Sequence, residues 1–175
     1  MASVAVTYAA NCTVVETLDE VIASAGTSSR KVTHKAFNVA RSLKGTTTPA
    51  VSIVTAFRVT QASGTYALDL TALPKTGGGT FSALGLKLRQ LKIVNLLTES
   101  SRILTMQGDP AVPFTPLMDS DEFYVTIPSG SDLLVNFGAN GAQVSAGNKG
   151  IWFNGYRIPD YVNGAMDFQL LMTFG

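Results

Sequence analysis

The residues best suited to chemistry are few and stand far apart. His34 is the only histidine and Cys12 the only cysteine among the 175 residues. A Ser-His-Asp triad needs histidine as its proton shuttle, and nothing in the sequence places a nucleophile or a carboxylate beside His34. One histidine and one cysteine are also too few for the usual zinc ligand set. We therefore expect no enzyme, with no catalytic, cofactor-binding or metal-binding residues. A hydrolase built on His34 is the remaining alternative.

Three other segments resemble binding motifs but lack part of the pattern. Residues 119–122 (DSDE) could offer oxygen ligands to calcium, yet they lack the glycine and the distal glutamate of an EF-hand loop, which favours a solvated loop. Residues 75–80 (KTGGGT) reverse the order of a phosphate loop and predict a hairpin turn. The basic stretch 30–44 has no aromatic stacking partner apart from Phe37. We therefore expect no cofactor and no direct contact with nucleic acid.

Aromatic residues near the C-terminus are the strongest candidates for a contact surface. Trp152, Tyr156 and Tyr161 stand among turn residues. Exposed aromatic side chains at such places anchor subunit interfaces or stack on sugar rings, and packing in the core is the third interpretation. For a subunit interface we expect contacts from Trp152 and Tyr156, from Phe114 in a proline-rich loop, and from Phe174 at the end of the last strand.

Short β-strands must position these residues. Apolar residues recur at every second position, or nearly so, in residues 51–59, 66–70, 123–127 and 133–137. This period is typical of strands with one buried face. Residues 166–174 are apolar on both faces and predict a strand that ties the C-terminal segment into a sheet or a subunit interface.

The segment 86–97 needs an irregularity to be a single strand. Its apolar residues change parity between Leu88 and Leu91, which a β-bulge near Arg89-Gln90 would correct. After the turn at residues 98–101, residues 102–106 are expected to return antiparallel. The second prediction assumes that strands that are neighbours in the sequence also pair in space.

Turn signals divide the rest of the chain. The dipeptides at 140–141, 154–155 and 163–164 are all Asn-Gly, whose residues tolerate positive φ, so each predicts a turn. Residues 109–116 hold three prolines and predict a long surface loop. Residues 17–26 stay open between a short helix, begun by a Thr17–Glu20 capping box, and an edge strand.

Together these signals predict an all-β protein. We expect an antiparallel β-sandwich, jelly-roll-like, with about 8–10 short strands and at most one short helix. Residues 1–175 form a single sandwich domain in this interpretation, with residues 1–48 as a candidate N-terminal arm or assembly segment.

The composition favours a surface that is covered by other protein. Only 14% of the residues are charged, against about a quarter in a typical soluble domain. The formal net charge of +1 gives no field that would attract nucleic acid or an anionic membrane. Residues 1–89 carry nine Lys/Arg against four Asp/Glu, and residues 90–175 four against eight. This asymmetry is either chance or a sign of head-to-tail contact between subunits.

Several segments resemble small β-sandwich structural proteins from the virion gene clusters of tailed bacteriophages. The resemblance covers residues 64–174 and rests on Tyr66–Leu73 (YALDLTAL), Leu91–Leu96 (LKIVNL), Ile103–Met106 (ILTM) and Ile127–Ser131 (IPSGS). The loop with three prolines departs from the family pattern. The resemblance implies a non-enzymatic virion component such as a tail, fibre, head-decoration or minor capsid protein.

We therefore expect a structural protein of a virus particle that forms a homo-oligomer. Its partners are copies of itself and other virion proteins, with no membrane partner. The N-terminus lacks the pattern of a signal peptide, and no apolar stretch reaches the roughly 20 residues of a membrane span, which predicts synthesis in the host cytoplasm. Two alternatives stay open: a jelly-roll coat protein of a small icosahedral virus, and a carbohydrate-binding module that uses Trp152 and Tyr156.

Overall fold

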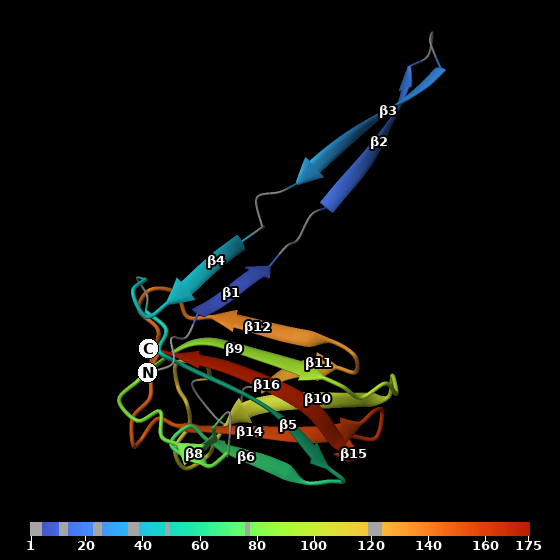
Figure 1. The fold of residues 1–175 in the computed structure, drawn as a ribbon. Coiled ribbons are helices and arrows are strands. Elements are labelled where there is room, and N and C mark those ends of the chain that lie inside the picture. The colour runs from blue at the N-terminus through green and yellow to red at the C-terminus, as the bar shows by residue number, and fades with distance from the viewer. Residues whose placement is uncertain are drawn as a thin grey trace. The chain divides into compact units, whose positions relative to one another are not determined.

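The computed structural model is an all-β protein, as the sequence predicts (Figure 1). It describes residues 5–10, 14–22, 26–34, 39–47, 50–75, 78–118 and 124–175. The described residues form strands, turns and irregular segments, and none of them forms a helix that could span a membrane.

The strands are numbered in chain order. They are β1 (Ala5–Ala10), β2 (Val14–Ile22), β3 (Gly26–His34), β4 (Val39–Lys44), β5 (Ile53–Gln61), β6 (Thr65–Asp69), β7 (Leu73–Pro74), β8 (Thr80–Phe81), β9 (Lys87–Asn95), β10 (Arg102–Gly108), β11 (Tyr124–Pro128), β12 (Asp132–Asn136), β13 (Ala142–Gln143), β14 (Gly150–Arg157), β15 (Val162–Asn163) and β16 (Met166–Phe174).

The chain divides into two compact units. Residues Ala5–Leu43 form one of them, which we call the ribbon; Lys44–Gly175 belong to the other. Within the ribbon, β1 pairs with β4, and β2 pairs with β3 in antiparallel register from Val14–His34 to Ile22–Gly26. In the segment that the sequence left open between helix and edge strand, the described residues 17–22 and 26 are therefore strand, because the ladder between β2 and β3 pairs the backbone groups that face each other.

The unit Lys44–Gly175 is a β-sandwich with jelly-roll pairing. Its eight long strands form four antiparallel pairs, the first with the last and so on inward: β5–β16, β6–β14, β9–β12 and β10–β11. These pairs assemble into two sheets, ordered β12-β9-β16-β5 and β11-β10-β14-β6. The short strand β13 adds to β9, and β15 adds to β14. Rolling four such pairs into two facing sheets is the jelly-roll arrangement.

The core lies between these two sheets. Phe168 of β16 is fully buried and its ring contacts Phe153 of β14, with centroids 4.8 Å apart. Tyr66 of β6 meets the edge of the Phe168 ring at 6.0 Å. Phe168 comes from one sheet, and Phe153 and Tyr66 come from neighbouring strands of the other. The aromatic cluster therefore joins the two layers. Burial of such apolar surface is the main stabilising term of the fold.

The predicted β-bulge in residues 86–97 is confirmed. Thr173 of β16 lies opposite Gln90, but the next residue, Phe174, lies opposite Leu88. Arg89 is therefore the extra residue of β9. The bulge allows Leu88, Leu91 and Ile93 all to be fully buried despite their change of parity.

The β10 strand forms where the sequence predicts one, but it does not return along β9. It pairs with β11 and β14 in the other sheet. The turn after Leu97 instead carries the chain across the sandwich, so the expectation that consecutive strands pair was wrong here. The C-terminal strand β16 is tied into a sheet, between β9 and β5.

The Asn-Gly at 154–155 is not a turn, contrary to the prediction. Both residues lie within β14, opposite Thr105 and Leu104 of β10. Gly155 is required for a different reason. A Cβ atom there would stand 2.6 Å from the carbonyl oxygen of Ala165 and 2.6 Å from Cγ of Met166. The turn prediction at Asn140-Gly141 holds, since Gly141 has a positive φ of 62°.

Candidate functional site

Two of the four expected contact residues lie in the core. Phe114 and Phe174 are both 0% exposed. Phe114 packs edge-on against Phe137 at 6.3 Å, and Phe174 against Phe81 at 5.9 Å. The proline-rich loop therefore runs at the surface but turns one large side chain inward. Both side chains are occupied by the sandwich itself, so neither offers an anchor to a partner in this structure.

Trp152 and Tyr156 lie together on the outer face of the sheet β11-β10-β14-β6. Successive residues of a strand point to opposite faces. Phe153 packs inward on Phe168, so Trp152, Asn154 and Tyr156 point away from the core. Trp152 and Tyr156 are half-buried, which leaves part of each ring accessible.

The registers of the four strands show what surrounds these two rings. Three successive rows cross the outer face: Tyr124–Gln107–Trp152–Ala67, Thr126–Thr105–Asn154–Thr65 and Pro128–Ile103–Tyr156–Asn163, the last residue coming from β15. No Asp, Glu, Lys, Arg or His stands in these three rows. We call them the neutral face.

The middle row of the neutral face is held by hydrogen bonds. The hydroxyl of Thr65 donates to Oδ1 of Asn154 at 2.5 Å, and the hydroxyl of Thr105 donates to the carbonyl oxygen of Asn154 at 3.3 Å. Asn154 and Thr105 are buried, 6% and 4% exposed, although they are on the outer face. The indole nitrogen of Trp152 is fully covered and has no hydrogen-bond partner among the described residues.

Charged residues border the neutral face at both ends, and beyond its last row Arg102 pairs in register with Arg157. The ammonium group of Lys149 lies 2.8 Å from Oδ2 of Asp69, at the end of β6. Asp109, just after β10, accepts a hydrogen bond from the backbone N–H of Ala111 at 2.8 Å. Both carboxylates are therefore engaged locally, and the three rows beside them stay uncharged.

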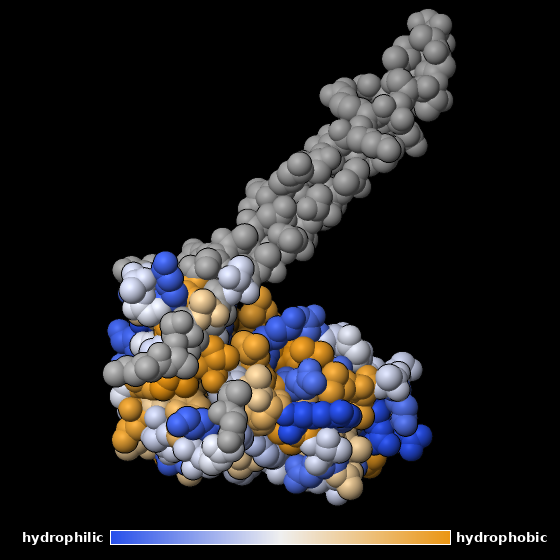
Figure 2. All heavy atoms as spheres, viewed as in Figure 1, coloured by the Kyte–Doolittle hydropathy of each residue, from blue (hydrophilic) through white to orange (hydrophobic). Residues whose placement is uncertain are grey.

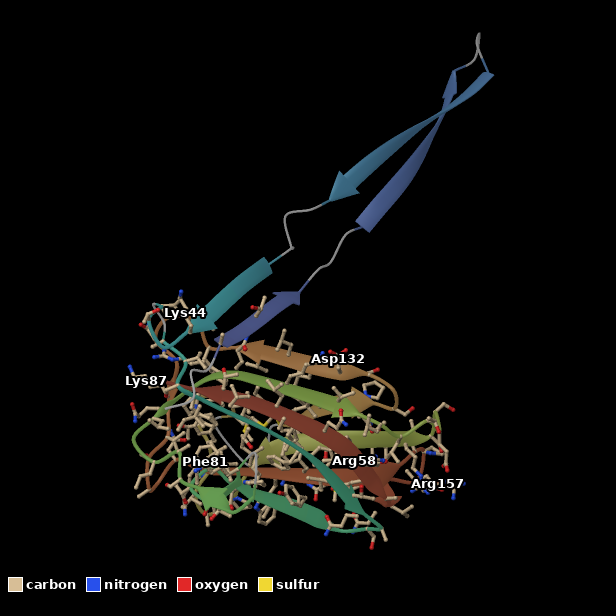
Figure 3. All side chains as sticks on the ribbon, in the orientation of Figure 1. Lys44, Arg58, Phe81, Lys87, Asp132 and Arg157 are labelled. Carbon is tan, nitrogen blue, oxygen red and sulfur yellow. The ribbon has the colours of Figure 1, made fainter. Side chains whose placement is uncertain are left out.

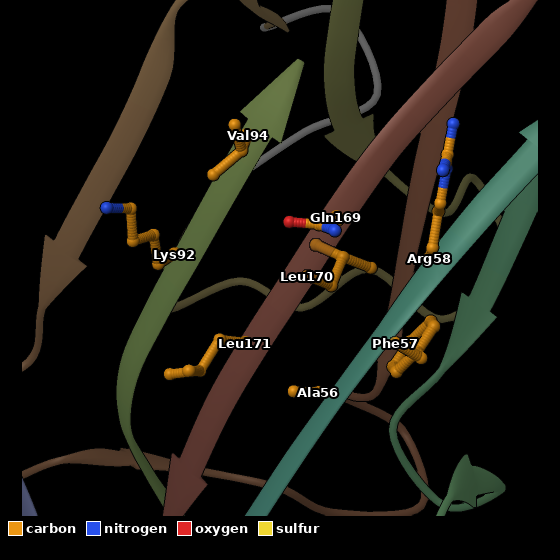
Figure 4. Close-up of a pocket in the computed structure, with 8 residues that line it drawn as sticks. All are labelled: Ala56, Phe57, Arg58, Lys92, Val94, Gln169, Leu170 and Leu171. Carbon is orange, nitrogen blue, oxygen red and sulfur yellow. The ribbon is translucent and has the colours of Figure 1, made fainter. Parts of the chain in front are cut away.

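A second surface is an open hollow on the outer face of the other sheet. Its volume is about 440 Å³, and it is lined by Ala56, Phe57, Arg58, Lys92, Val94, Gln169, Leu170 and Leu171 (Figure 4). Leu171, 36% exposed, stands between Lys92 of β9 and Ala56 of β5. Val94 and Gln169 form the next row. The floor of the hollow is therefore mainly apolar.

Two ion pairs flank this hollow. On one side, Nε of Arg58 donates to Oδ1 of Asp167 at 2.7 Å, and on the other Nζ of Lys92 lies 3.3 Å from Oδ2 of Asp132. Arg58 on β5 and Asp132 on β12 mark the two outer strands of this sheet (Figure 3). The hydrogen bonds and the charge of Arg58 hold the pKa of the Asp167 carboxyl below its usual value. This pair stays ionised down to more acidic pH than an isolated aspartate would.

The face of the sandwich seen in Figure 2 is a mosaic rather than a charged shell. On this face, apolar side chains form patches between separate hydrophilic ones. Such patches on the outside of a domain mark contact sites when they are bordered by polar groups.

The remaining candidate residues are not gathered into a site by the described part of the chain. His34 ends β3, where its register partner is Val14. Cys12 and the acidic cluster at 119–122 lie outside the described residues. The strands β7 and β8, on either side of the Gly-rich segment, pair antiparallel, whereas Thr76 and Gly77 within it lie outside the described residues. Sequence reasoning missed Tyr124 and Leu171, whose exposure follows from strand pairing rather than from any local signal.

The fold and these surfaces define a jelly-roll β-sandwich protein that carries a two-stranded ribbon, a neutral aromatic face and an apolar hollow. Comparison of the chain with protein-family models, curated proteins and solved structures found no significant match. Its function is therefore argued from its own residues.

Proposed function

We propose that the chain is a non-enzymatic structural subunit of a virus particle, which assembles with copies of itself and with other virion proteins. The observation that carries this proposal is the ribbon. In its described residues each strand has one hydrogen-bonded neighbour, because β1 pairs with β4 and β2 with β3 in two-stranded sheets. An isolated two-stranded hairpin is at best marginally stable in water.

The sequence of the ribbon adds a reason for it to be covered by protein. β2 contains Val14, Val15, Leu18, Val21 and Ile22 among its nine residues. A single layer of two strands cannot enclose so many apolar residues. Among the described residues β2 and β3 pair with no further strand, so each of them is an edge strand. Neighbouring subunits would supply the missing layer and the missing hydrogen bonds.

The apolar hollow supports the same proposal from the sandwich. Its centre, around Leu171 and Ala56, is apolar, and its borders are the ion pairs of Arg58 and Lys92. An apolar centre with a polar rim is the usual anatomy of a protein–protein interface. The occupant that we propose is a second copy of the chain. Only 14% of its residues are charged, which lowers the free-energy cost of removing water from two such surfaces when they meet.

The first prediction concerns the ribbon. Replacing residues 11–38 by Asn-Gly keeps β1 and β4 and removes β2 and β3. We expect the full chain to form a homo-oligomer at micromolar concentration. This variant is expected to contain fewer subunits per particle, because the contacts of β2 and β3 are lost. Light scattering and native mass spectrometry measure the number of subunits for the full chain and for the variant. Circular dichroism of the variant must retain the β-sheet signal, since the core of the sandwich lies outside the replaced segment.

A stable monomer of the full chain would contradict the proposal. Particles lacking the protein that assemble normally would contradict the virion role in the same way. Closed shells formed by the purified chain alone, seen by electron microscopy, would favour the coat protein of a small icosahedral virus. Jelly rolls occur in viral capsids and also in lectins, and a fold alone does not decide between functions.

The second prediction concerns the hollow. Leu171→Asp places a carboxylate in its apolar floor, and we expect weaker self-association by roughly tenfold or more, because a charge buried in an interface without a partner is costly. Leu84→Asp is the matched control, since Leu84 is 55% exposed and does not line the hollow. Sedimentation of both variants over a dilution series measures the effect. Equal association constants for the two variants would show that the hollow is not an interface.

A further inference from the structure

We infer that the neutral face is a binding site for a neutral oligosaccharide. This site is separate from the ribbon and the hollow, on which the proposed assembly depends. The inference rests on the three rows of side chains across β11, β10, β14 and β6, and on the arrangement of aromatic and polar groups within them.

The chemistry of the face selects an uncharged polar ligand. Its three rows hold hydroxyl, amide, aromatic and small apolar side chains and no charged group. A charged ligand placed here would lose hydration without gaining an opposite charge, which is costly. Sugar hydroxyls lose less, because the exposed hydroxyls of Thr65 and Thr126 and the half-buried amide of Gln107 can form hydrogen bonds with them as donors or acceptors.

The aromatic residues are spaced for an extended ligand. Trp152 and Tyr156 are four residues apart on one strand, which separates their Cα atoms by about 13 Å. Tyr124 lies in the same row as Trp152 with one strand between them, which is about 10 Å across the sheet. Tyr124 is 57% exposed. Rings at such distances on one face of a sheet can each stack on a different sugar unit of the same oligosaccharide.

The position of the aromatic residues argues against a protein occupant. In a protein–protein interface the apolar groups lie at the centre and the polar groups at the rim. On the neutral face the order is reversed. The middle row is Thr126–Thr105–Asn154–Thr65, and the aromatic rings stand in the two rows on either side of it. The hollow on the opposite sheet has the order that a protein partner would need.

Native affinity electrophoresis of the full chain tests this inference. Soluble starch, a mixed-linkage β-glucan and galactomannan serve as neutral probes, and heparin as the anionic probe. We expect at least one neutral polysaccharide to retard the chain and heparin not to do so. Trp152→Ala and Tyr156→Ala are each expected to weaken that binding by roughly tenfold or more, since truncation of a central aromatic contact commonly has effects of this size.

Two further variants keep the test independent of folding. Tyr124→Ala and Thr126→Asp change exposed side chains of β11, so the core stays intact. Both are expected to weaken binding, the first by removing a ring and the second by placing a charge in the middle row. Trp152→Phe keeps an aromatic ring and loses no hydrogen bond to the described residues, and it is expected to retain most of the affinity. Tyr161→Ala is the control, since Tyr161 is 64% exposed and lies in the turn after β14.

Three results would overturn the inference. The first is the absence of retardation by every neutral probe, and the second is binding that Tyr161→Ala reduces more than Trp152→Ala. The third is a change in oligomeric mass, without sugar binding, in Tyr124→Ala or Thr126→Asp, which would make the face a contact between subunits. Failure of the proposed assembly looks different, because it appears as a monomeric wild-type chain whatever its affinity for sugar.

Discussion

Replacement of Phe168 by alanine is expected to lower the free energy of unfolding by about 3–5 kcal/mol, the usual range for a fully buried phenylalanine. Phe168 is 0% exposed and contacts both Phe153 and Tyr66. The loss of stability has two parts. The favourable free energy of transferring the ring out of water is lost, and a cavity remains between the sheets. Aromatic pairs add about 0.5–1.5 kcal/mol beyond the buried area, and two such pairs are lost here.

Urea unfolding followed by tryptophan fluorescence measures this change, at one fixed protein concentration because association shifts apparent stability. Leu84→Ala is the control, because Leu84 does not line the hollow that we propose as an interface. Leu84 is 55% exposed, so its truncation is expected to cost well under half as much. Phe168→Leu should fall between the two, because it refills part of the cavity. A loss below about 1.5 kcal/mol for Phe168→Ala would show that the two sheets are not held together by this cluster.

Local periodicity was sufficient to predict several of the sandwich strands. The alternation in residues 51–59, 66–70 and 133–137 corresponds to β5, β6 and β12 with shifts of a few residues. The parity change in residues 86–97 even located the bulge at Arg89. These features follow from which face of a strand is buried, because a strand with one buried face has apolar residues at every second position.

Pairing between distant strands could not be read in the same way. β10 joins β11 and β14 rather than β9, because a jelly roll sends consecutive strands to opposite sheets. No residue near the turn at 98–101 signals this choice. Gly155 was wrongly assigned to a turn for a similar reason. Its requirement comes from the carbonyl oxygen of Ala165 and the side chain of Met166, a contact that exists only once β14 and the segment after β15 are in place.

The four expected contact residues lie in two different environments for a related reason. Trp152 and Tyr156 lie on an accessible face, whereas Phe114 and Phe174 are in the core. Aromatic residues beside turns and strand ends look alike in a sequence whichever way they point. The neutral face in particular depends on the register of four strands. Tyr124 joins Trp152 in one row only through β10, so no local pattern could place them together.

The second large effect is expected at Asn95, the last residue of β9. Asn95 is 1% exposed, and its Nδ2 donates to the carbonyl oxygen of Ile127 on β11 at 3.0 Å. Since β9 and β11 belong to different sheets, this hydrogen bond links the two layers at one corner. Its Oδ1 also accepts from the backbone N–H of Leu97 at 3.2 Å. Asn95 thus fixes the segment where the chain leaves one sheet for the other.

Asn95→Leu is expected to lower the free energy of unfolding by about 1–3 kcal/mol for the carbonyl of Ile127 alone, because a buried acceptor loses its donor. The unpaired N–H of Leu97 adds to this loss. Asn140→Ala, in the exposed turn after β12, is the control and should stay within about 0.5 kcal/mol of the wild type.

Asn95→Asp separates the hydrogen bond from the shape of the side chain. An ionised aspartate keeps the acceptor for Leu97 but cannot donate to Ile127, and burial raises the pKa of such a carboxyl. As the pH falls below that raised pKa, the protonated side chain can donate again. The deficit in stability against the wild type should therefore be largest at neutral pH and shrink on acidification. A deficit that is constant with pH, in chemical unfolding measured from neutral to acidic buffers, would mean that the bond to Ile127 contributes nothing. The corner would then be held by the backbone bonds of Asn95 to Ser131 and Gly130 alone.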